Sequence, residues 1–462
     1  MAERRSAREV LALVTDAGSF TDIPCVIREP EPDGPLGWQG YDASRARAAE
    51  RTGEEESVVC GTGRVEGVPA VLIAFEFGFL GGSLGGRTGD RLEAAYAYAR
   101  EHRLPVVPLI ATGGSRMQEG MLALTQLQRV ARQSALTREA GLAQIAVLRD
   151  PTTGGGWATL GAGADVVLAL PGAQVGFAGS RVRPPDADPA AYTAQAQLAA
   201  GAADAVVAPA ELKGVLGAWL RLLSRGTAGR RPAEPAPVPA ALGEAALPAT
   251  GWEAVRRARS PERPRAGAYL DAYFTHRAGI GGDRCGGRDD DGMLCGFGER
   301  DGRTVAYAAQ TGSATRPAGY RTAARLIRLA DRLGIAVLTL VDTPGAANDA
   351  EAERQGAGAA IAEVFAAVAG ARVPVTTLVV GEGGSGGALA LAAPGNTWVT
   401  PDGYFSVIAP ELAAAILKRP PEEVEATAGQ LRIRPQDLVE LGVVRGIAEH
   451  TDHAVHADRP GT

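Results

Sequence analysis

Four glycine-rich segments are the parts of this chain best suited to chemistry. They are TGGSR (112–116), PTTGGG (151–156), DTPGA (342–346) and EGGSGGA (382–388). Each follows a run of apolar residues, so we expect each to turn the chain from a buried strand into a helix. Glycines at such a turn expose backbone N–H groups that no helical carbonyl accepts. Those donors can hold an oxyanion, such as the enolate oxygen of a thioester, without any ionisable side chain.

Ser385 offers a competing interpretation, because the residues around it read GGSGG and fit the GxSxG motif of a nucleophile elbow. An apolar strand precedes it, and Asp402, Asp437 and His450 follow in the order of a hydrolase triad. The same pattern arises by chance in glycine-dense segments, as it does at 81–85. His450 also lies in a polar terminal stretch, which makes a serine hydrolase the weaker hypothesis.

The sequence offers few residues suited to metal binding or to acid–base catalysis by side chains. The cysteines at 25, 60, 285 and 295 form no CxxC pair, so neither a zinc ribbon nor a disulfide framework is predicted. Lysine occurs only at 213 and 418, and neither position fits the lysine of a phosphate-binding loop, which excludes that class of NTPase. We therefore expect a metal-free cytoplasmic protein with reduced cysteines.

Composition excludes several further classes. The chain has 462 residues with 47 basic and 53 acidic side chains, so its net charge of −6 offers no basic field for nucleic acid. Hydrophobic residues make up 45% and charged residues 22%, as in a folded globular protein. No apolar run is long enough to cross a membrane, and the first residues do not resemble a signal peptide. We expect neither a nucleic-acid partner nor a membrane partner.

The elements that position the four turns occur twice along the chain. The amphipathic segment 88–104 leads to the strand PVVPLIA and the turn at 112, as 319–334 leads to IAVLTLV and the turn at 342. The segments 144–179 and 373–410 then each supply a second strand and a second turn. Buried strands that alternate with helices predict an α/β fold with largely parallel strands, which places ligands at their carboxyl ends.

The duplication also predicts the domain organisation. A stretch rich in Pro, Ala and Arg lies near the middle of the chain, without the period of a helix or a strand. We interpret it as a linker. The predicted boundaries are an N-terminal domain at 1–230, a linker at 231–264 and a C-terminal domain at 265–462.

These turns and their surroundings resemble the carboxyltransferase component of biotin-dependent acyl-CoA carboxylases. The first half is similar to the β subunit of the bacterial acetyl-CoA carboxylase carboxyltransferase, and the second half is similar to the α subunit. The matching runs in the first half are FEFGFLGGSLG (75–85), TGGSRMQEGMLAL (112–124), LRDPTTGGGWA (148–158) and VGFAGSRV (175–182). Those in the second half include LVDTPGA (340–346), GEGGSGGALAL (381–391) and YFSVIAPE (404–411).

The resemblance implies a fold of two tandem crotonase-like domains, each a β-β-α superhelix. It also implies transfer of a carboxyl group from carboxybiotin to a short acyl-CoA, with acetyl-CoA giving malonyl-CoA. In that reaction Gly113 and Gly114 would hold the thioester oxygen, and Gly386, Gly387 and Ala388 the ureido oxygen of biotin. The residues expected to contact CoA or biotin are Gly81, Gly82, Ser115, Arg116, Gly154, Gly155, Phe177, Ala178, Gly345 and Ala346.

The same resemblance implies partners and leaves alternatives open. The chain carries no biotinylation sequence and no ATP-grasp domain, so biotin would arrive on a biotin carboxyl carrier protein charged by a biotin carboxylase. Because the glycine pairs lie in different halves, each site would form between two copies, in a dimer or a trimer of dimers. The zinc ribbon usual in the β subunit is missing, and DTPGAANDA replaces the family's DTPGAYPG. A biotin-independent decarboxylase of a malonyl-type thioester and a non-catalytic complex subunit therefore remain as alternatives.

Overall fold

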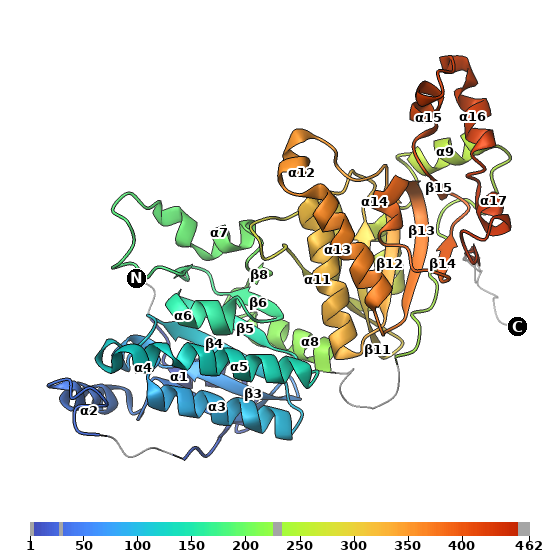
Figure 1. The fold of residues 1–462 in the computed structure, drawn as a ribbon. Coiled ribbons are helices and arrows are strands. Elements are labelled where there is room, and N and C mark those ends of the chain that lie inside the picture. The colour runs from blue at the N-terminus through green and yellow to red at the C-terminus, as the bar shows by residue number, and fades with distance from the viewer. Residues whose placement is uncertain (1–3, 27–30, 225–232, 451–462) are drawn as a thin grey trace, which may run out of the picture. The chain divides into compact units, whose positions relative to one another are not determined.

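The chain forms two compact units, each built on its own β-sheet (Figure 1). A computed structural model describes residues 4–26, 31–224 and 233–450. The first unit comprises residues 1–232 with the short segments 278–288 and 332–335, and the second comprises 233–277, 289–331 and 336–462. No helix in these described ranges is both long enough and apolar enough to cross a membrane.

The first unit begins its main sheet with an antiparallel hairpin and continues it with parallel strands. Strands β2 (Val58–Val65) and β3 (Val68–Phe75) are joined by Glu66 and Gly67, both with positive φ, as a tight hairpin turn requires. Strands β4, β5 and β6 then add in parallel. The sheet order over the described residues is β1-β2-β3-β4-β5-β6-β8, with β7 paired to β5.

Helices of the first unit cover this sheet because their apolar faces pack against the apolar side chains of the strands. Every residue of β4 is buried, so its continuous apolar run needs cover on both faces. Helices α3 and α5 lie side by side over the sheet, and Leu92, Tyr96 and Val130 pack into its core (Figure 1). The elements are α1 (Ala7–Val14), β1 (Thr21–Asp22), α2 (Tyr41–Thr52), α3 (Gly86–Glu101), β4 (Val106–Thr112), α4 (Gly120–Leu124), α5 (Gln126–Glu139), β5 (Ile145–Thr153), α6 (Gly154–Gly156), β6 (Val166–Ala169), β7 (Val175–Gly176), α7 (Ala194–Ala199), β8 (Ala205–Val206) and α8 (Leu212–Ser224).

The second unit repeats this plan. Strands β10 (Met293–Arg300) and β11 (Arg303–Gln310) form the hairpin, again through two residues of positive φ, Asp301 and Gly302. The described strands are ordered β16-β14-β13-β12-β11-β10-β9, with β15 paired to β13. The remaining elements are α9 (Gly251–Arg259), α10 (Ala266–Tyr273), β9 (His276–Ile280), α11 (Pro317–Leu333), β12 (Val337–Thr343), α12 (Ala350–Arg354), α13 (Ala357–Gly370), β13 (Val375–Gly384), α14 (Ser385–Leu389), β14 (Thr397–Val399), β15 (Tyr404–Ser406), α15 (Pro410–Ile416), α16 (Val424–Gln430), α17 (Pro435–Glu440) and β16 (Gly446–Ile447).

Both sheets change register at the same place. The β4–β5 ladder shifts between Ile110 and Thr112, and the β12–β13 ladder shifts between Val341 and Thr343. The regular pairing is therefore interrupted just before each glycine turn. This edge of each sheet is where parallel α/β proteins bind their ligands.

The segment predicted as a linker contains regular structure over its described part. Helix α9 begins after Thr250, whose hydroxyl accepts a hydrogen bond from the Glu253 N–H, a common N-cap. Ala254 and Val255 of this helix are buried against Tyr404 of the second unit. We propose that the second domain begins near residue 233 and that the tether between domains is shorter than the predicted 231–264. Residues 225–232 lie outside the described ranges.

Candidate functional site

The turn at 112–116 in the first unit uses its own backbone donors internally. The Gly113 N–H donates to the carbonyl of Gly81 at 2.9 Å, and the Gly114 N–H donates to Oγ1 of Thr112 at 3.1 Å. Gly114 has a φ of +114°, a conformation that favours glycine. Ser115 bridges Leu84 in parallel, which ties the turn to the loop that carries Gly81 and Gly82.

The turn at 151–156 leaves two donors uncommitted. The Gly154 N–H donates to the Phe177 carbonyl at 3.0 Å, and Gly154 has a φ of +65°. Gly155 and Gly156 then open the helical segment, where no preceding carbonyl is placed to accept their N–H groups. A Cβ on Gly154 would lie 3.2 Å from Cα of Gly114, so the two turns of this unit touch.

The remaining predicted residues of the first unit lie around these turns. Gly81 and Gly82 both have positive φ, and a Cβ on Gly82 would lie 2.1 Å from the carbonyl oxygen of Ala111. Phe177 is 75% exposed, and Ala178 is partly exposed beside it. The structure thus brings the predicted residues of the first half to one edge of one sheet.

The Arg116 side chain is buried, whereas a residue that binds a ligand needs an accessible side chain. That of Arg116 is 1% exposed and pairs with Glu56 at 2.5 Å. Its other N–H groups donate to the Tyr41 hydroxyl and to the Ser83 hydroxyl and carbonyl. Burial alone would raise the pKa of Glu56, but the Arg116 charge outweighs it and lowers that pKa to about 2. Arg116 therefore anchors the turn from beneath and offers no free donor to a ligand.

In the second unit, strand β13 runs into the turn that carries Gly386 and Gly387. Ser385 has a φ of +58°, and the two glycines follow in the first turn of α14, where no helical acceptor exists for their N–H groups. A Cβ on Gly386 would meet no atom within 4 Å, so open space lies in front of it. A Cβ on Gly387 would lie 2.5 Å from the backbone nitrogen of Ala346.

The turn at 342–346 matches the turn at 112–116 in detail. The Gly345 N–H donates to Oγ1 of Thr343 at 3.2 Å, as Gly114 does to Thr112. Ala346 bridges Thr315, as Ser115 bridges Leu84. The Gly345 N–H is therefore also used in a hydrogen bond within its own turn.

The geometry defines which glycines correspond between the two units. Gly154 and Ser385 share a positive φ directly before a glycine pair, so Gly155 and Gly156 occupy the positions of Gly386 and Gly387. Gly113 and Gly114 correspond instead to Pro344 and Gly345 of the other turn. A donor role for Gly113 and Gly114 would require both of their internal hydrogen bonds to break.

Two arginines from the segment that the sequence predicted to be a linker reach strand ends of the second unit, which the sequence did not indicate. Arg263 pairs at 2.5 Å with the fully buried Asp342, which ends the apolar run of β12. Arg259 pairs at 3.0 Å with Glu382, three residues before Ser385. The Tyr404 hydroxyl also donates to Glu382 at 2.5 Å. These pairs hold both strand ends that lead into the glycine turns.

The hydrolase interpretation of Ser385 finds no triad. The His450 imidazole contacts the Gly243 carbonyl at 2.8 Å, and Asp437 pairs with Arg434 at 2.8 Å. Asp402 accepts a hydrogen bond from the Glu244 N–H at 2.9 Å. The groups that a nucleophilic serine would need are engaged elsewhere.

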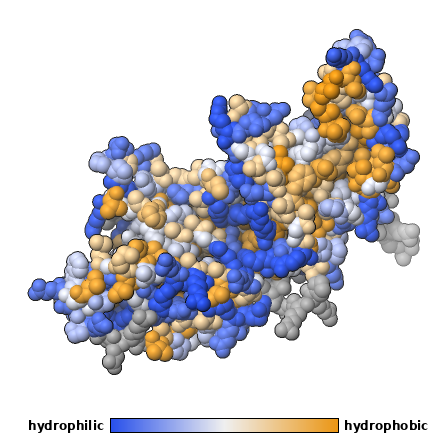
Figure 2. All heavy atoms as spheres, viewed as in Figure 1, coloured by the Kyte–Doolittle hydropathy of each residue, from blue (hydrophilic) through white to orange (hydrophobic). Residues whose placement is uncertain are grey.

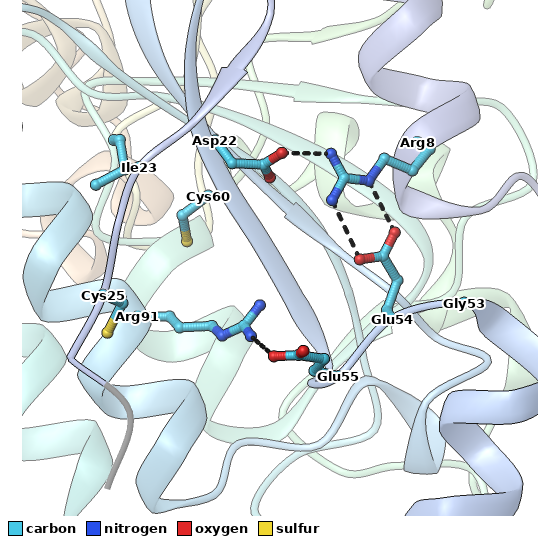
Figure 3. A pocket seen from close by; sticks show the side chains of 9 residues that line it. All are labelled: Arg8, Asp22, Ile23, Cys25, Gly53, Glu54, Glu55, Cys60 and Arg91. Atoms are coloured by element: carbon cyan, nitrogen blue, oxygen red, sulfur yellow. Dashed lines mark hydrogen bonds and ion pairs between the residues drawn. The ribbon is translucent and has the colours of Figure 1, made fainter.

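A polar pocket of about 310 Å³ lies in the first unit apart from the predicted residues (Figure 3). Arg8 bridges Glu54 and Asp22, and Arg91 pairs with Glu55, so every charged side chain of the lining is in an ion pair. Burial raises the pKa of Cys60 to about 12, which keeps this thiol protonated. In the described part of the chain, no three His, Cys, Asp or Glu side chains gather closely enough to hold a metal ion.

Comparison with known proteins identifies the family. A model for acetyl co-enzyme A carboxylase carboxyltransferase-like proteins matches residues 245–462, and a carboxyl transferase domain model matches residues 37–205. The acetyl-coenzyme A carboxylase carboxyl transferase subunits beta/alpha of Saccharopolyspora erythraea is 38% identical over 99% of this chain and 84% of its own length. The chain belongs to the fused beta/alpha carboxyl transferase family. The family resemblance seen in the sequence is confirmed, and so is its prediction of a carboxyltransferase enzyme of the acyl-CoA carboxylase type.

Other members and structures agree with this assignment. A probable biotin-dependent acyl-coenzyme A carboxylase beta3 subunit of Mycobacterium bovis is 33% identical over 97% of this chain and 89% of its own length. The crystal structure of transcarboxylase 12S, a hexamer, superposes with a TM-score of 0.78 at 20% identity, over 96% of this chain and 87% of that one. This likeness confirms the predicted fold class. The matched proteins are carboxyl transferases and carboxylase subunits, which gives the decarboxylase alternative no support.

Proposed function

We propose that this chain transfers a carboxyl group from carboxybiotin, presented on a separate biotin carboxyl carrier protein, to acetyl-CoA. A biotin carboxylase would recharge that carrier. The observation that supports this proposal is the matched pair of glycine turns, one in each unit, whose glycine N–H groups lie in the first turn of a helix, where no helical carbonyl can accept them. Such a pair suits a reaction with two oxyanions, one on a thioester and one on a ureido group.

The first half-site is proposed to hold the thioester. We assign the donors to Gly155 and Gly156, because the N–H groups of Gly113 and Gly114 already have acceptors. Gly113 and Gly114 instead form the surface against which Gly154 packs. The Gly81 carbonyl accepts the Gly113 N–H, and Gly82 packs against the Ala111 carbonyl. Phe177 supplies an exposed apolar face.

The second half-site is proposed to hold biotin. Carboxybiotin bound there would supply the CO₂ and a ureido nitrogen basic enough to accept the α-proton of the thioester. The backbone N–H groups of Gly386, Gly387 and Ala388 would stabilise the charge on the ureido oxygen. The open space in front of Gly386 fits a bound group, and the packing of Gly387 against Ala346 leaves no room for a side chain there. Gly345 and Ala346 line the floor of this half-site.

Each donor of this kind lowers a barrier by about 3 kcal/mol in acyl-transfer enzymes. Such donors need no titratable group, which explains a site that holds neither His nor Lys. The α-carbon and the CO₂ must also approach within about 3–3.5 Å, so the two half-sites must face each other during catalysis.

Exposed apolar side chains near both half-sites favour assembly with a second copy of the chain. In the first unit Met117 is 76% exposed and Met121 is 68% exposed, directly after the turn at 112–116. In the second unit Val407 is 72% exposed and Ile416 is 68% exposed, on segments that follow β13 (orange over α14 and α15 in Figure 2). Such surfaces mark interfaces. We propose that the first half of one chain faces the second half of another across a twofold axis.

Subunit mixing tests this arrangement. Gly155→Pro and Gly386→Pro each remove one donor N–H, so each variant alone should be inactive. Random exchange between equal amounts makes about half of the dimers mixed, and each mixed dimer keeps one undamaged site of two. Activity should therefore recover to about a quarter of wild type, once both variants are shown to fold and exchange. No recovery despite exchange would mean that each chain builds its own site.

The acyl group is tested by running the reaction backwards. Purified protein is given malonyl-CoA or methylmalonyl-CoA with free biotin as the acceptor, and loss of each thioester is followed. We expect malonyl-CoA to react faster, by about tenfold or more, since one methyl group is worth that much in a fitted pocket. A preference for methylmalonyl-CoA would replace acetyl-CoA by propionyl-CoA in the proposal.

A further inference from the structure

The carbonyl oxygen of Gly387 accepts two hydrogen bonds from buried side chains of the second unit. The Tyr320 hydroxyl donates to it at 3.0 Å, and the Gln310 amide donates to it at 3.1 Å. Tyr320 is 1% exposed and Gln310 is fully buried. The Gln310 amide also donates to Oγ1 of the buried Thr315 at 3.3 Å, which extends this network of buried side chains.

These two hydrogen bonds fix the direction of a neighbouring donor. The Gly387 carbonyl and the Ala388 N–H belong to the same planar trans amide, so they point in opposite directions. Holding the carbonyl against Tyr320 and Gln310 therefore fixes the direction of the Ala388 N–H, on the opposite side of that amide. Hydrogen bonds to a carbonyl also polarise its amide, which strengthens the N–H as a donor. Burial raises the pKa of Tyr320, so its hydroxyl stays protonated and remains a donor.

Among the described residues of the first unit, the equivalent positions offer no counterpart to this network. Leu84 holds the place of Thr315, since each bridges the residue that follows its unit's Thr-x-Gly turn. Counted from there, Gly89 of α3 stands where Tyr320 stands in α11. Phe75 ends β3 as Gln310 ends β11. None of the three residues has a side chain that can donate a hydrogen bond, so this support belongs to one half-site alone.

We propose that Tyr320 and Gln310 are positioning residues that orient and strengthen the backbone donors of the second half-site. The inference rests on the proposed function, in which that half-site holds the ureido oxygen of biotin. It predicts that these side chains affect turnover, while binding of the acyl-CoA, at the other half-site, is unchanged.

The test compares two tyrosine variants that lose the same kind of hydrogen bond. Tyr320→Phe removes the donor to the Gly387 carbonyl. Tyr273→Phe is the matched control, because that hydroxyl is also in the interior of the second unit and donates at 2.9 Å to a backbone carbonyl, that of Pro237. Thermal unfolding and the kinetics of biotin-dependent malonyl-CoA loss are measured for wild type and both variants.

We expect Tyr320→Phe to lower kcat by roughly three- to tenfold, the effect of one lost hydrogen bond, with KM for malonyl-CoA within twofold of wild type. Tyr273→Phe should keep the wild-type kcat while losing similar thermal stability. Gln310→Leu should lower kcat in the same way as Tyr320→Phe.

Equal kcat values for Tyr320→Phe and Tyr273→Phe would overturn the inference, whether both are unchanged or both have fallen. A rise in KM for malonyl-CoA without a fall in kcat would also overturn it. Absence of biotin-dependent turnover in the wild-type protein is a separate result, because it would remove the proposed function itself and the inference with it.

Discussion

Replacing Gly387 by alanine adds a methyl group where the second unit has no room for one. The new Cβ would lie 2.5 Å from the backbone nitrogen of Ala346 and 2.6 Å from the Tyr320 hydroxyl. Ordinary contacts begin at 3.4 Å, so the backbone of one turn must move by about 0.9 Å, the difference between 3.4 and 2.5 Å. Because the closest atom belongs to the main chain, a change of side-chain rotamer cannot relieve the overlap.

That displacement is large enough to abolish most of the activity. A shift of about 1 Å in a catalytic group costs on the order of 100-fold in rate. Overpacking of this kind also costs about 1–3 kcal/mol in the free energy of unfolding. We therefore expect Gly387→Ala to fold with reduced stability and to show about 1% of the wild-type rate of biotin-dependent malonyl-CoA loss.

Gly358→Ala is the matched control for this prediction. Gly358 lies in α13, and a Cβ there would meet no atom within 4 Å. The variant should keep full activity and gain about 0.5–1 kcal/mol in unfolding free energy from helix propensity. If Gly387→Ala retained more than about a third of the wild-type rate, the turn would not hold the catalytic donors as argued.

Further variants test the buried charges and Ser385. Glu56→Gln removes the closer counter-charge of the buried Arg116 and leaves only Glu119, at 3.5 Å. We therefore expect urea unfolding to show a loss of about 3 kcal/mol, and a loss below about 1 kcal/mol would count against the pairing. Because the folded pKa of Glu56, about 2, lies below its ordinary 4.5, its contribution is present above pH 4.5 and is lost as the pH falls towards 2. As the pH is lowered across that range, the free energy of unfolding should therefore fall more steeply for wild type than for Glu56→Gln. Ser385→Ala should keep most of the activity, whereas labelling of Ser385 by a fluorophosphonate with loss of turnover would restore the hydrolase hypothesis.

The order of strands and turns could be predicted from the sequence because each turn carries a local signature. Continuous apolar runs followed by the glycine-rich turns that begin at 112, 151, 342 and 382 mark the ends of buried strands, and all four turns lie at strand ends in the structure. The sequence repeat also pairs the second turn of the first half with the second turn of the second half. The order of strands and turns therefore follows from local sequence patterns that occur in both halves.

The state of each backbone donor could not be predicted, because it depends on residues distant in sequence. The acceptor of the Gly113 N–H is the carbonyl of Gly81, on a different loop. Arg116 resembles a ligand-binding residue by its place after a glycine pair, but Glu56, which neutralises it, lies 60 residues earlier. The role of Arg259 and Arg263 could not be predicted for the same reason, since Arg263 contacts Asp342 only in the folded second unit.

The most direct test of the central claim is the dependence of malonyl-CoA loss on free biotin. Purified protein is incubated with malonyl-CoA, with and without biotin, and acetyl-CoA formation is measured over time alongside Gly387→Ala. A carboxyltransferase should form acetyl-CoA only when biotin is present, at a rate that rises with biotin concentration and is lost in the variant. Acetyl-CoA formation at the same rate without biotin would show decarboxylation in place of carboxyl transfer and would contradict the account.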